Sequence, residues 1–211
     1  MNGSRMDRTR HAVNAWFLHR ADGMMHRIYG QRKRAIYAGL PSAIVEIGPG
    51  AGANLRYYAP RTRLIAIEPN PAMYRHLQKT AQRYEIDLQI KAEKGEKIDL
   101  PDKSVSTVVG TLVLCSVDNP RQVLSEVRRI LKPGGRFIFL EHVADLPGTA
   151  LRARQEYLRR AWSWAFDGCH LNRETHAVIQ GAGFAGVDMN CFMMKSRLLP
   201  FAPHIFGVAV N

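Results

Sequence analysis

The chain has 211 residues, and 46% of them are hydrophobic, which suits one domain with a substantial core. Its formal net charge of +12 favours anionic partners, without choosing among nucleic acid, anionic lipid and acidic small molecules. The three cysteines lie far apart, which excludes a secreted disulfide framework and favours a reducing, cytoplasmic compartment. No apolar stretch reaches the roughly 18 residues of a membrane-spanning helix, and the N-terminus lacks a signal-peptide pattern. We therefore expect a soluble or peripheral protein.

The first 40 residues are predicted to form one or two basic helices, and Pro41 ends this region. Their apolar residues form two clusters on either side of Asp22 and Gly23, namely Ala12, Val13, Trp16, Phe17 and Leu18, then Met24, Met25, Ile28 and Tyr29. The apolar side of such a segment suits a lid over a ligand, and its basic side suits contact with an anionic membrane. Both interpretations stay open.

From residue 41 onward, short apolar runs alternate with helical patterns. Strand-like runs occupy Ala43–Ile47, Arg63–Ile67, Leu88–Ala92, Val105–Thr111 and Gly135–Glu141, and helical patterns lie near Leu55–Tyr58, Pro71–Tyr84 and Pro120–Leu131. This alternation is typical of βαβ units and predicts a parallel sheet covered on both faces. Two further helical stretches, Leu151–Phe166 and Arg173–Gly181, precede two closing strands, Val187–Met194 and Ile205–Val210, for which we expect antiparallel pairing.

The turn after the first strand carries the strongest functional signal. A buried strand leads to Glu46, and Gly48, Gly50 and Gly52 follow at alternate positions. Glycine lets the backbone turn sharply and approach a ligand closely, and the amide groups beyond the loop are free to bind it. The spacing differs from the Gly-x-Gly-x-x-Gly of pyrophosphate-binding dinucleotide folds. A tighter loop of this kind suits S-adenosylmethionine (SAM), which has no pyrophosphate and presents an amino-acid moiety.

Glu68 stands at the end of the second strand, about 20 residues after the loop, where an acid accepts hydrogen bonds from a ribose diol. The alternative is that Glu68 is an ordinary acid at a helix N-terminus, before Pro69, Asn70 and Pro71. The combination of loop and acid favours the cofactor interpretation.

The motifs in this half of the chain resemble those of class I SAM-dependent methyltransferases. The resemblance is carried by the series Val45–Gly52, Ile67–Asn70, Gly95-Glu96 ahead of Pro101–Ser104, and Leu131–Gly135. It implies a Rossmann-like α/β fold with a seven-stranded, mostly parallel sheet of order 3-2-1-4-5-7-6, whose seventh strand is antiparallel. The resemblance also implies a set of SAM-binding residues: Glu46, Gly48, Pro49, Gly50, Gly52, Asn54, Glu68, Pro69, Asn70, Met73, Gly95, Glu96, Leu112 and Cys115. Lys94 stands where many members of the class have an aspartate.

The second half resembles the methyltransferase-like thiol S-methyltransferases, which are microsomal alkyl-thiol methyltransferases in animals with bacterial relatives. The matching segments are Thr111–Val117, Glu141–Val143, Phe166–Glu174 and Pro203–Val210. The resemblance implies methyl transfer to a small apolar thiol, within one domain made of a lid (1–40), a SAM-binding core (41–145) and an acceptor side (146–211). The animal proteins carry a hydrophobic N-terminal anchor, whereas this chain begins with a basic, interrupted amphipathic segment.

Three residues are candidates for the proton transfer that thiol methylation requires. A free thiol has a pKa of about 8.5, so a base that removes its proton increases the reactive thiolate. His142 is the first candidate, because it follows the fifth strand at the edge where open α/β sheets bind ligands. The alternative for His142 is a strand-end histidine bonded to backbone. Asp167 is expected to cap its segment rather than act as a base, and His204 to line the acceptor pocket.

The cysteines and the remaining histidines do not predict a metal site. Cys115 suits a small buried side chain at the end of the fourth strand, and Cys169 beside Gly168 suits a turn. His170 and His176 share a segment but have no acidic or cysteine partner at ligand spacing. We therefore expect no metal.

Other functions remain possible from the sequence. A basic N-terminus suits methylation of a phospholipid amine or a quinone precursor at a membrane surface. The net charge alone suits RNA binding or RNA modification, yet the apolar run Leu112–Cys115 does not resemble an acceptor clamp for a nucleobase. A third alternative is a non-catalytic SAM-binding protein.

Overall fold

The computed structural model describes residues 23, 25–194 and 200–211. Within them, the chain forms two compact units, one up to Lys94 and one from Gly95 onward. The predicted apolar cluster around Trp16 and Phe17, together with Met24, lies outside the described residues, so the lid interpretation is not tested. The expected single domain also stays a prediction.

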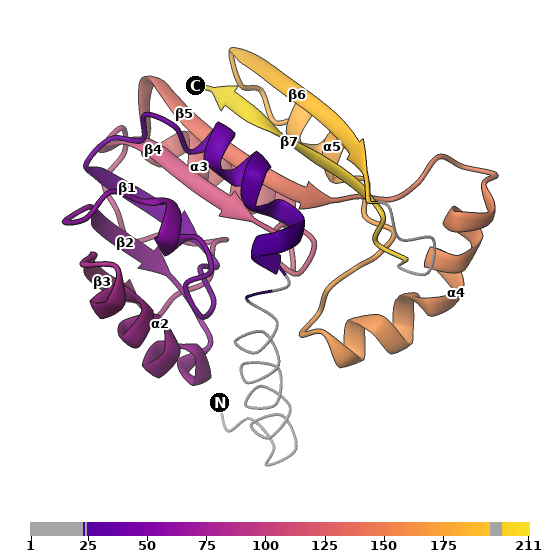
Figure 1. Cartoon of the computed structure of the whole chain (residues 1–211). Helices are drawn as coiled ribbons and strands as arrows, with labels where there is room; N and C mark the ends of the chain where they lie inside the picture. Colours follow the sequence, from indigo (N-terminus) through magenta and orange to yellow (C-terminus); the bar gives the residue numbers. More distant parts are fainter. Residues whose placement is uncertain (1–22, 24, 195–199) are drawn as a thin grey trace. The chain divides into compact units, whose positions relative to one another are not determined.

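The first unit contains three parallel strands that the sequence pattern predicted closely. Helical residues 25–36 precede β1 (Ala43–Ile47), which pairs with β2 (Arg63–Ile67), and β2 pairs with β3 (Asp87–Lys91) (Figure 1). β1 buries all its residues except the first, as expected for a strand covered on both faces.

The helix α2 (Pro71–Arg83) connects β2 to β3. It begins with a proline at the first position, and the side chain of Asn70 accepts a hydrogen bond from the Ala72 amide at 3.0 Å. Both features favour a helix start, because proline lacks an N–H that would go unused there and the cap satisfies a free amide. Its buried residues Met73, Leu77 and Ala81 recur every four positions.

The second unit contains the remaining four strands. β4 (Val105–Thr111) leads through α3 (Pro120–Ile130) to β5 (Leu131–His142), which is parallel to β4. After α4 (Ala150–Ala165) and α5 (Thr175–Gln180) come β6 (Gly186–Met193) and β7 (Pro203–Val210). β7 lies between β5 and β6 and is antiparallel to both, so the antiparallel closing pair is confirmed (Figure 1).

The complete sheet has the order β3-β2-β1-β4-β5-β7-β6, which confirms the expected Rossmann-like class I methyltransferase fold. In the first unit β1 and β2, and in the second unit β4 and β5, are parallel, and ligands bind at the carboxyl ends of such strands in open α/β sheets. No helix among the described residues has the length and apolar character of a membrane span.

Most predicted boundaries lie within two residues of those in the structure, and two predicted elements differ more. The helix expected near Leu55–Tyr58 is a single 3₁₀ turn, Leu55–Tyr57, because the chain returns at once to an extended conformation at Tyr58. β5 begins at Leu131 rather than at Gly135, since Leu131 already pairs with Val105 and the register shifts before the pairing resumes. The proline and two glycines therefore form an irregularity inside the strand.

Candidate functional site

The glycine loop between β1 and η1 (Leu55–Tyr57) adopts a conformation that suits glycine. Gly48, Gly50 and Gly52 have φ angles of 63°, 56° and 88°, in the left-handed region that other L-residues rarely adopt. The Gly48 amide donates to the Ile67 carbonyl at 2.9 Å, which ties the loop to the end of β2. The local conformation expected from the sequence is therefore present.

Two glycines of the loop face different surroundings. A Cβ atom at Gly52 would lie 3.1 Å from Leu77 Cδ1 and from two side-chain atoms of Thr80, so this glycine allows close packing against α2. A Cβ atom at Gly50 would meet no described atom within 4 Å. The loop therefore packs against its own helix at Gly52 and leaves its backbone accessible at Gly50, as a close-approach ligand site requires.

Glu68 is a buried carboxylate that connects the loop to the start of α2. Its Oε2 accepts a hydrogen bond from the Gly50 amide at 3.0 Å, and its Oε1 accepts one from the Asn70 amide at 2.9 Å. Tyr74 donates its hydroxyl to the Glu68 carbonyl at 2.9 Å. The side chain that caps α2 is Asn70, and Glu68 binds the Asn70 amide just before the helix, so Glu68 supports both the glycine loop and the start of α2.

Glu46 supports the loop from within the unit. The side-chain Nδ2 of Asn54 donates to Oε1 of Glu46 at 2.6 Å, and the Tyr58 hydroxyl donates to Oε2 at 2.9 Å. Burial raises the pKa of Glu46 to about 7, although both hydrogen bonds act in the opposite direction. Two residues predicted to bind the cofactor, Glu46 and Asn54, thus hold each other.

The other residues of this unit that are predicted to bind the cofactor come after β2. Pro69 precedes the capping residue Asn70, whose side-chain Nδ2 is buried with no hydrogen-bond partner among the described residues. An orphaned buried donor at this position fits a polar ligand group. Met73 is almost fully buried on the inner face of α2.

In the second unit, Gly95 and Glu96 precede β4. Gly95 is buried, and Glu96 Oε1 accepts a hydrogen bond from the Asn119 amide at 3.1 Å. Leu112, at the end of β4, has a φ of 53°, which is rare for a non-glycine residue and marks a strained turn. Its amide donates to the Leu140 carbonyl at 2.8 Å.

The loop after β4 is held by two residues that the sequence analysis did not single out. Glu141 is fully buried, and its Oε1 accepts hydrogen bonds from the amides of Val113 and Leu114 at 2.9 and 3.0 Å. Burial raises the pKa of Glu141 to about 7 against the effect of these amides. Arg173 Nη1 donates to the carbonyls of Leu114 and Val117 at 2.6 and 2.8 Å. The loop is therefore clamped from two directions.

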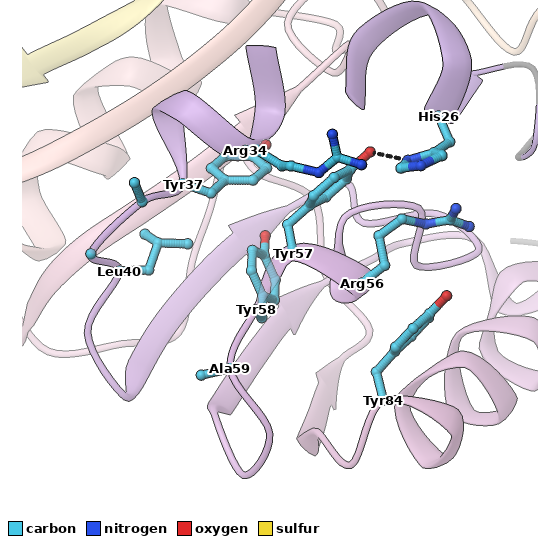
Figure 2. A pocket seen from close by; sticks show the side chains of 11 residues that line it. His26, Arg34, Tyr37, Leu40, Arg56, Tyr57, Tyr58, Ala59 and Tyr84 are labelled. Atoms are coloured by element: carbon cyan, nitrogen blue, oxygen red, sulfur yellow. Dashed lines mark hydrogen bonds between the residues drawn. The ribbon is translucent and has the colours of Figure 1, made fainter. Parts of the chain in front are cut away.

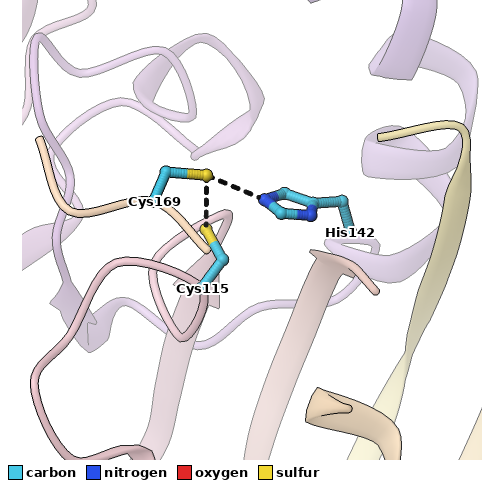
Figure 3. A group of neighbouring side chains, drawn as sticks. All are labelled: Cys115, His142 and Cys169. Carbon is cyan, nitrogen blue, oxygen red and sulfur yellow. Dashed lines mark hydrogen bonds between the residues drawn. The ribbon is translucent and has the colours of Figure 1, made fainter. Parts of the chain in front are cut away.

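This clamp assembles a cluster of Cys115, His142 and Cys169 (Figure 3). The sulfur atoms of Cys115 and Cys169 lie 3.7 Å apart, and His142 Nε2 lies 3.1 Å from Cys169 Sγ. Trp162 donates its indole N–H to Cys169 Sγ at 3.4 Å. Cys115 and His142 are buried and Cys169 is partly exposed. The three residues come from the ends of two strands and from the segment after α4.

The groups in the cluster perturb one another. The hydrogen bond with Cys115 and the proximity of His142 lower the pKa of Cys169, while the same thiol contact and burial raise the pKa of Cys115. Burial by itself disfavours the charged imidazole, but the hydrogen bond and charge of Cys169 raise the pKa of His142.

The side chain of His142 is buried, and its Nδ1 has no hydrogen-bond partner among the described residues. Among the described residues, the His142 side chain bonds to sulfur rather than to backbone, because its Nε2 faces Cys169 Sγ. His204 pairs with His142 across β5 and β7. Its Nδ1 lies 3.0 Å from the Ala202 carbonyl, which accepts only, so Nδ1 carries the proton.

Asp167 has a φ of 50° directly after α4, followed by Gly168 with a φ of 85°. The Gly168 amide donates to the Ser163 carbonyl, closing the helix end. This conformation is that of a helix-terminating turn, as the capping interpretation expects, and it directs Cys169 back towards Cys115.

A pocket of about 820 Å³ lies in the first unit, away from the glycine loop (Figure 2). It is lined by residues that precede β1, β2 and β3, including Leu40, Ala59 and Tyr84, and by residues of the first helix. His26 Nδ1 and the Tyr57 hydroxyl, 2.6 Å apart, close one side. The pocket is thus at the amino edge of these strands, opposite the carboxyl edge that carries Gly48 and Glu68.

Known proteins are similar to this chain over most of its length. The family model described as a methyltransferase domain matches residues 45–139. The chain is 39% identical over 171 residues to thiol S-methyltransferase TMT1B of Rattus norvegicus, covering 80% of this chain and 70% of that one. It is 35% identical over 207 residues to thiol S-methyltransferase TMT1A of Homo sapiens, covering 93% and 85%. A solved structure of a SAM-dependent methyltransferase from Thermotoga maritima has a TM-score of 0.67 at 20% identity, covering 93% and 97%.

Proposed function

Because the chain belongs to the thiol S-methyltransferase family, whose fold and cofactor are those of SAM-dependent methyltransferases, we propose that it methylates the sulfur of a small apolar thiol. The protein is a SAM-dependent methyltransferase that acts on a small molecule. The observation that carries the thiol assignment is the identity of 35 to 40% to four curated thiol S-methyltransferases across most of the chain.

We propose that the first unit binds SAM through the accessible backbone at Gly50 and through Glu68 and Asn70. Glu68 already orders the loop by accepting the Gly50 amide, and a ribose diol presents hydroxyl donors that a carboxylate accepts. The unpartnered Nδ2 of Asn70 offers a donor beside it. When bound, SAM supplies a methyl group on a positively charged sulfur.

The reaction that follows is an in-line displacement. The acceptor thiolate forms a bond to the methyl carbon while the bond between this carbon and the sulfonium sulfur breaks. The opposite charges of thiolate and sulfonium neutralise each other, which leaves a methyl thioether and S-adenosylhomocysteine. Positioning of the two reactants supplies much of such a rate enhancement.

We propose that His142 accepts the thiol proton at Nδ1. When Nε2 donates its hydrogen to the Cys169 sulfur, the lone pair is on Nδ1, the nitrogen without a partner in the described chain. The contacts of His204 and Asp167 support positioning roles, because His204 packs beside His142 with ring centroids 6.3 Å apart and Asp167 turns the chain that carries Cys169.

The direct test is production of S-adenosylhomocysteine by the purified protein with SAM and a panel of acceptors. The panel contains alkyl and aryl thiols, phosphatidylethanolamine vesicles and a polyphenol. We expect turnover on the thiols. Turnover confined to the lipid amine or to the polyphenol would overturn the thiol assignment while leaving the methyltransferase intact.

We further propose that the enzyme is cytoplasmic with peripheral contact to anionic membrane through its basic N-terminal region. Support comes from the excess of arginine and lysine in residues 1–40, part of which lies outside the described residues. Sedimentation with vesicles of phosphatidylserine and phosphatidylcholine tests this proposal. Binding should weaken as salt increases, and equal sedimentation with vesicles of phosphatidylcholine alone would contradict it.

A further inference from the structure

We propose that Cys115, His142 and Cys169 form a three-ligand binding site for a thiophilic divalent cation, of which Zn²⁺ is the best match. The sequence predicted no metal, because the three residues are far apart along the chain and none belongs to a spaced ligand motif. The fold brings their sulfur and nitrogen atoms within 4.8 Å of one another.

Two of the three ligand pairs lie near the distances of a metal-ligand set, and the third pair, Cys115 and His142, lies within 4.8 Å. With bonds of about 2.3 Å to sulfur and about 2.05 Å to nitrogen, tetrahedral zinc places two sulfur ligands about 3.8 Å apart and a sulfur and a nitrogen about 3.5 Å apart. The two cysteine sulfur atoms are 3.7 Å apart, which agrees without any movement. His142 Nε2 and Cys169 Sγ, at 3.1 Å, need to separate by a few tenths of an ångström, which a small side-chain rotation provides.

The chain holds these ligands in place through backbone contacts. The His170 amide donates to the Cys115 carbonyl at 2.9 Å, so the two cysteine-bearing segments are bonded next to the ligands themselves. Glu141 holds the amides just before Cys115, and Arg173 holds the carbonyls on either side of it. A site held in advance in this way binds a cation without paying the full entropy of ordering its ligands.

The ligand types select the cation. Two thiolates and one imidazole favour zinc over the oxygen-preferring magnesium and calcium. Binding of one Zn²⁺ to the two thiols releases their protons to solvent, with no change in oxidation state. Three protein ligands leave a fourth coordination position for water or for an added thiolate.

Metal binding has a consequence for methyl transfer, and this consequence, unlike the binding itself, rests on the proposed function. A histidine that coordinates zinc through Nε2 carries its proton on Nδ1. His142 is then unable to accept the proton of the acceptor thiol. We therefore expect the zinc-loaded protein to be slower on alkyl thiols than the same protein without metal.

Titration of the reduced, metal-free protein with Co²⁺, which reports tetrahedral sulfur ligation by its absorption, tests the binding. We expect one Co²⁺ per chain, sulfur-to-cobalt charge-transfer bands, and loss of both spectrum and bound Co²⁺ when Zn²⁺ is added. Cys169→Ser should weaken Co²⁺ binding by at least about a hundredfold. Replacing a residue that only supports a metal ligand already lowers metal affinity by about 10–100-fold, and Cys169 is itself a ligand. Cys191→Ser is the matched control, since Cys191 is exposed on β6 and outside the cluster, and it should bind as the wild type does.

Absence of the sulfur-to-cobalt bands, or equal binding by Cys169→Ser and the wild type, would overturn the site. Loss of binding in Cys191→Ser would do the same. Because Cys115 is buried and its replacement can unfold the protein, the half-buried Cys169 carries the test, with circular dichroism to confirm that the variant folds. The cobalt spectrum does not depend on any methyl acceptor, so it decides the metal site even if the protein methylates no thiol.

Discussion

Replacement of Glu68 by glutamine tests the assignment of the cofactor site. Glu68 has two oxygens that accept backbone amides from Gly50 and Asn70, and it is the acid expected to accept the ribose hydroxyls. Glutamine keeps the size but replaces one accepting oxygen by an amide donor. Hydrogen bonds to a charged group contribute about 1.5–3 kcal/mol each. We therefore expect SAM to bind roughly 10–150-fold more weakly to Glu68→Gln, the factor that one such bond represents.

Isothermal titration calorimetry with SAM measures this difference directly. Glu156→Gln makes the same chemical change at an exposed position on α4 and should leave the dissociation constant within about twofold, as is usual for surface substitutions. Thermal unfolding without SAM shows whether Glu68→Gln still folds, since the loop also loses part of its support. If the folded Glu68→Gln protein binds SAM within twofold of the wild type, Glu68 does not contact the cofactor and the reasoning is wrong.

Four further substitutions have distinct expected outcomes. Gly52→Ala should lower the free energy of unfolding by about 1–3 kcal/mol, because its methyl group meets α2 in a left-handed conformation. Gly50→Ala shares the left-handed strain but meets no atom within 4 Å, so it should lose less stability than Gly52→Ala and more SAM affinity; urea unfolding and calorimetry that gave equal losses for the two variants would contradict this. His142→Gln should slow methylation of alkyl thiols by about 10²–10⁴-fold and that of more acidic aryl thiols far less, so an equal loss of kcat on both would reject its role as base. Glu46, with its pKa of about 7 when folded against 4.5 when unfolded, binds more protons in the folded state between these values. Stability should therefore fall as pH rises through this window, and Glu46→Gln should show a flatter urea-unfolding profile between pH 5 and 8; an unchanged slope would contradict the raised pKa.

Local sequence patterns were sufficient for much of the fold. The strand β1 and its glycines, the proline and asparagine that start α2, and the apolar run of β4 each follow from chemistry within a few residues. The antiparallel pairing of β7 was correctly expected from its position as a closing strand. The start of β5 was predicted too late, because proline and glycine indicated a turn whereas pairing of Leu131 with Val105 extends the strand.

Some candidate site residues can also be recognised from local sequence, whereas others depend on contacts made only in the fold. Glu68 could be predicted as a candidate site residue because an acid at the end of the second strand is informative by itself, and its contact with the cofactor stays a prediction. Tyr58, Glu141 and Arg173 were not found, because a tyrosine, a glutamate and an arginine without a local motif resemble ordinary core or surface residues. Their roles depend on partners that are near only after folding, such as Glu46 for Tyr58 and the loop after β4 for the other two.

The sequence by itself determined the parallel sheet, the glycine loop with its acid, and hence the cofactor, because these depend on backbone conformation and short-range spacing. The cluster of Cys115, His142 and Cys169 was decided only by the tertiary structure. Its members are 27 and 54 residues apart along the chain, and no pattern of local spacing links them. Strand order, the turn at Asp167 and the backbone bond between His170 and Cys115 bring them together, and that proximity shifts the pKa of each group.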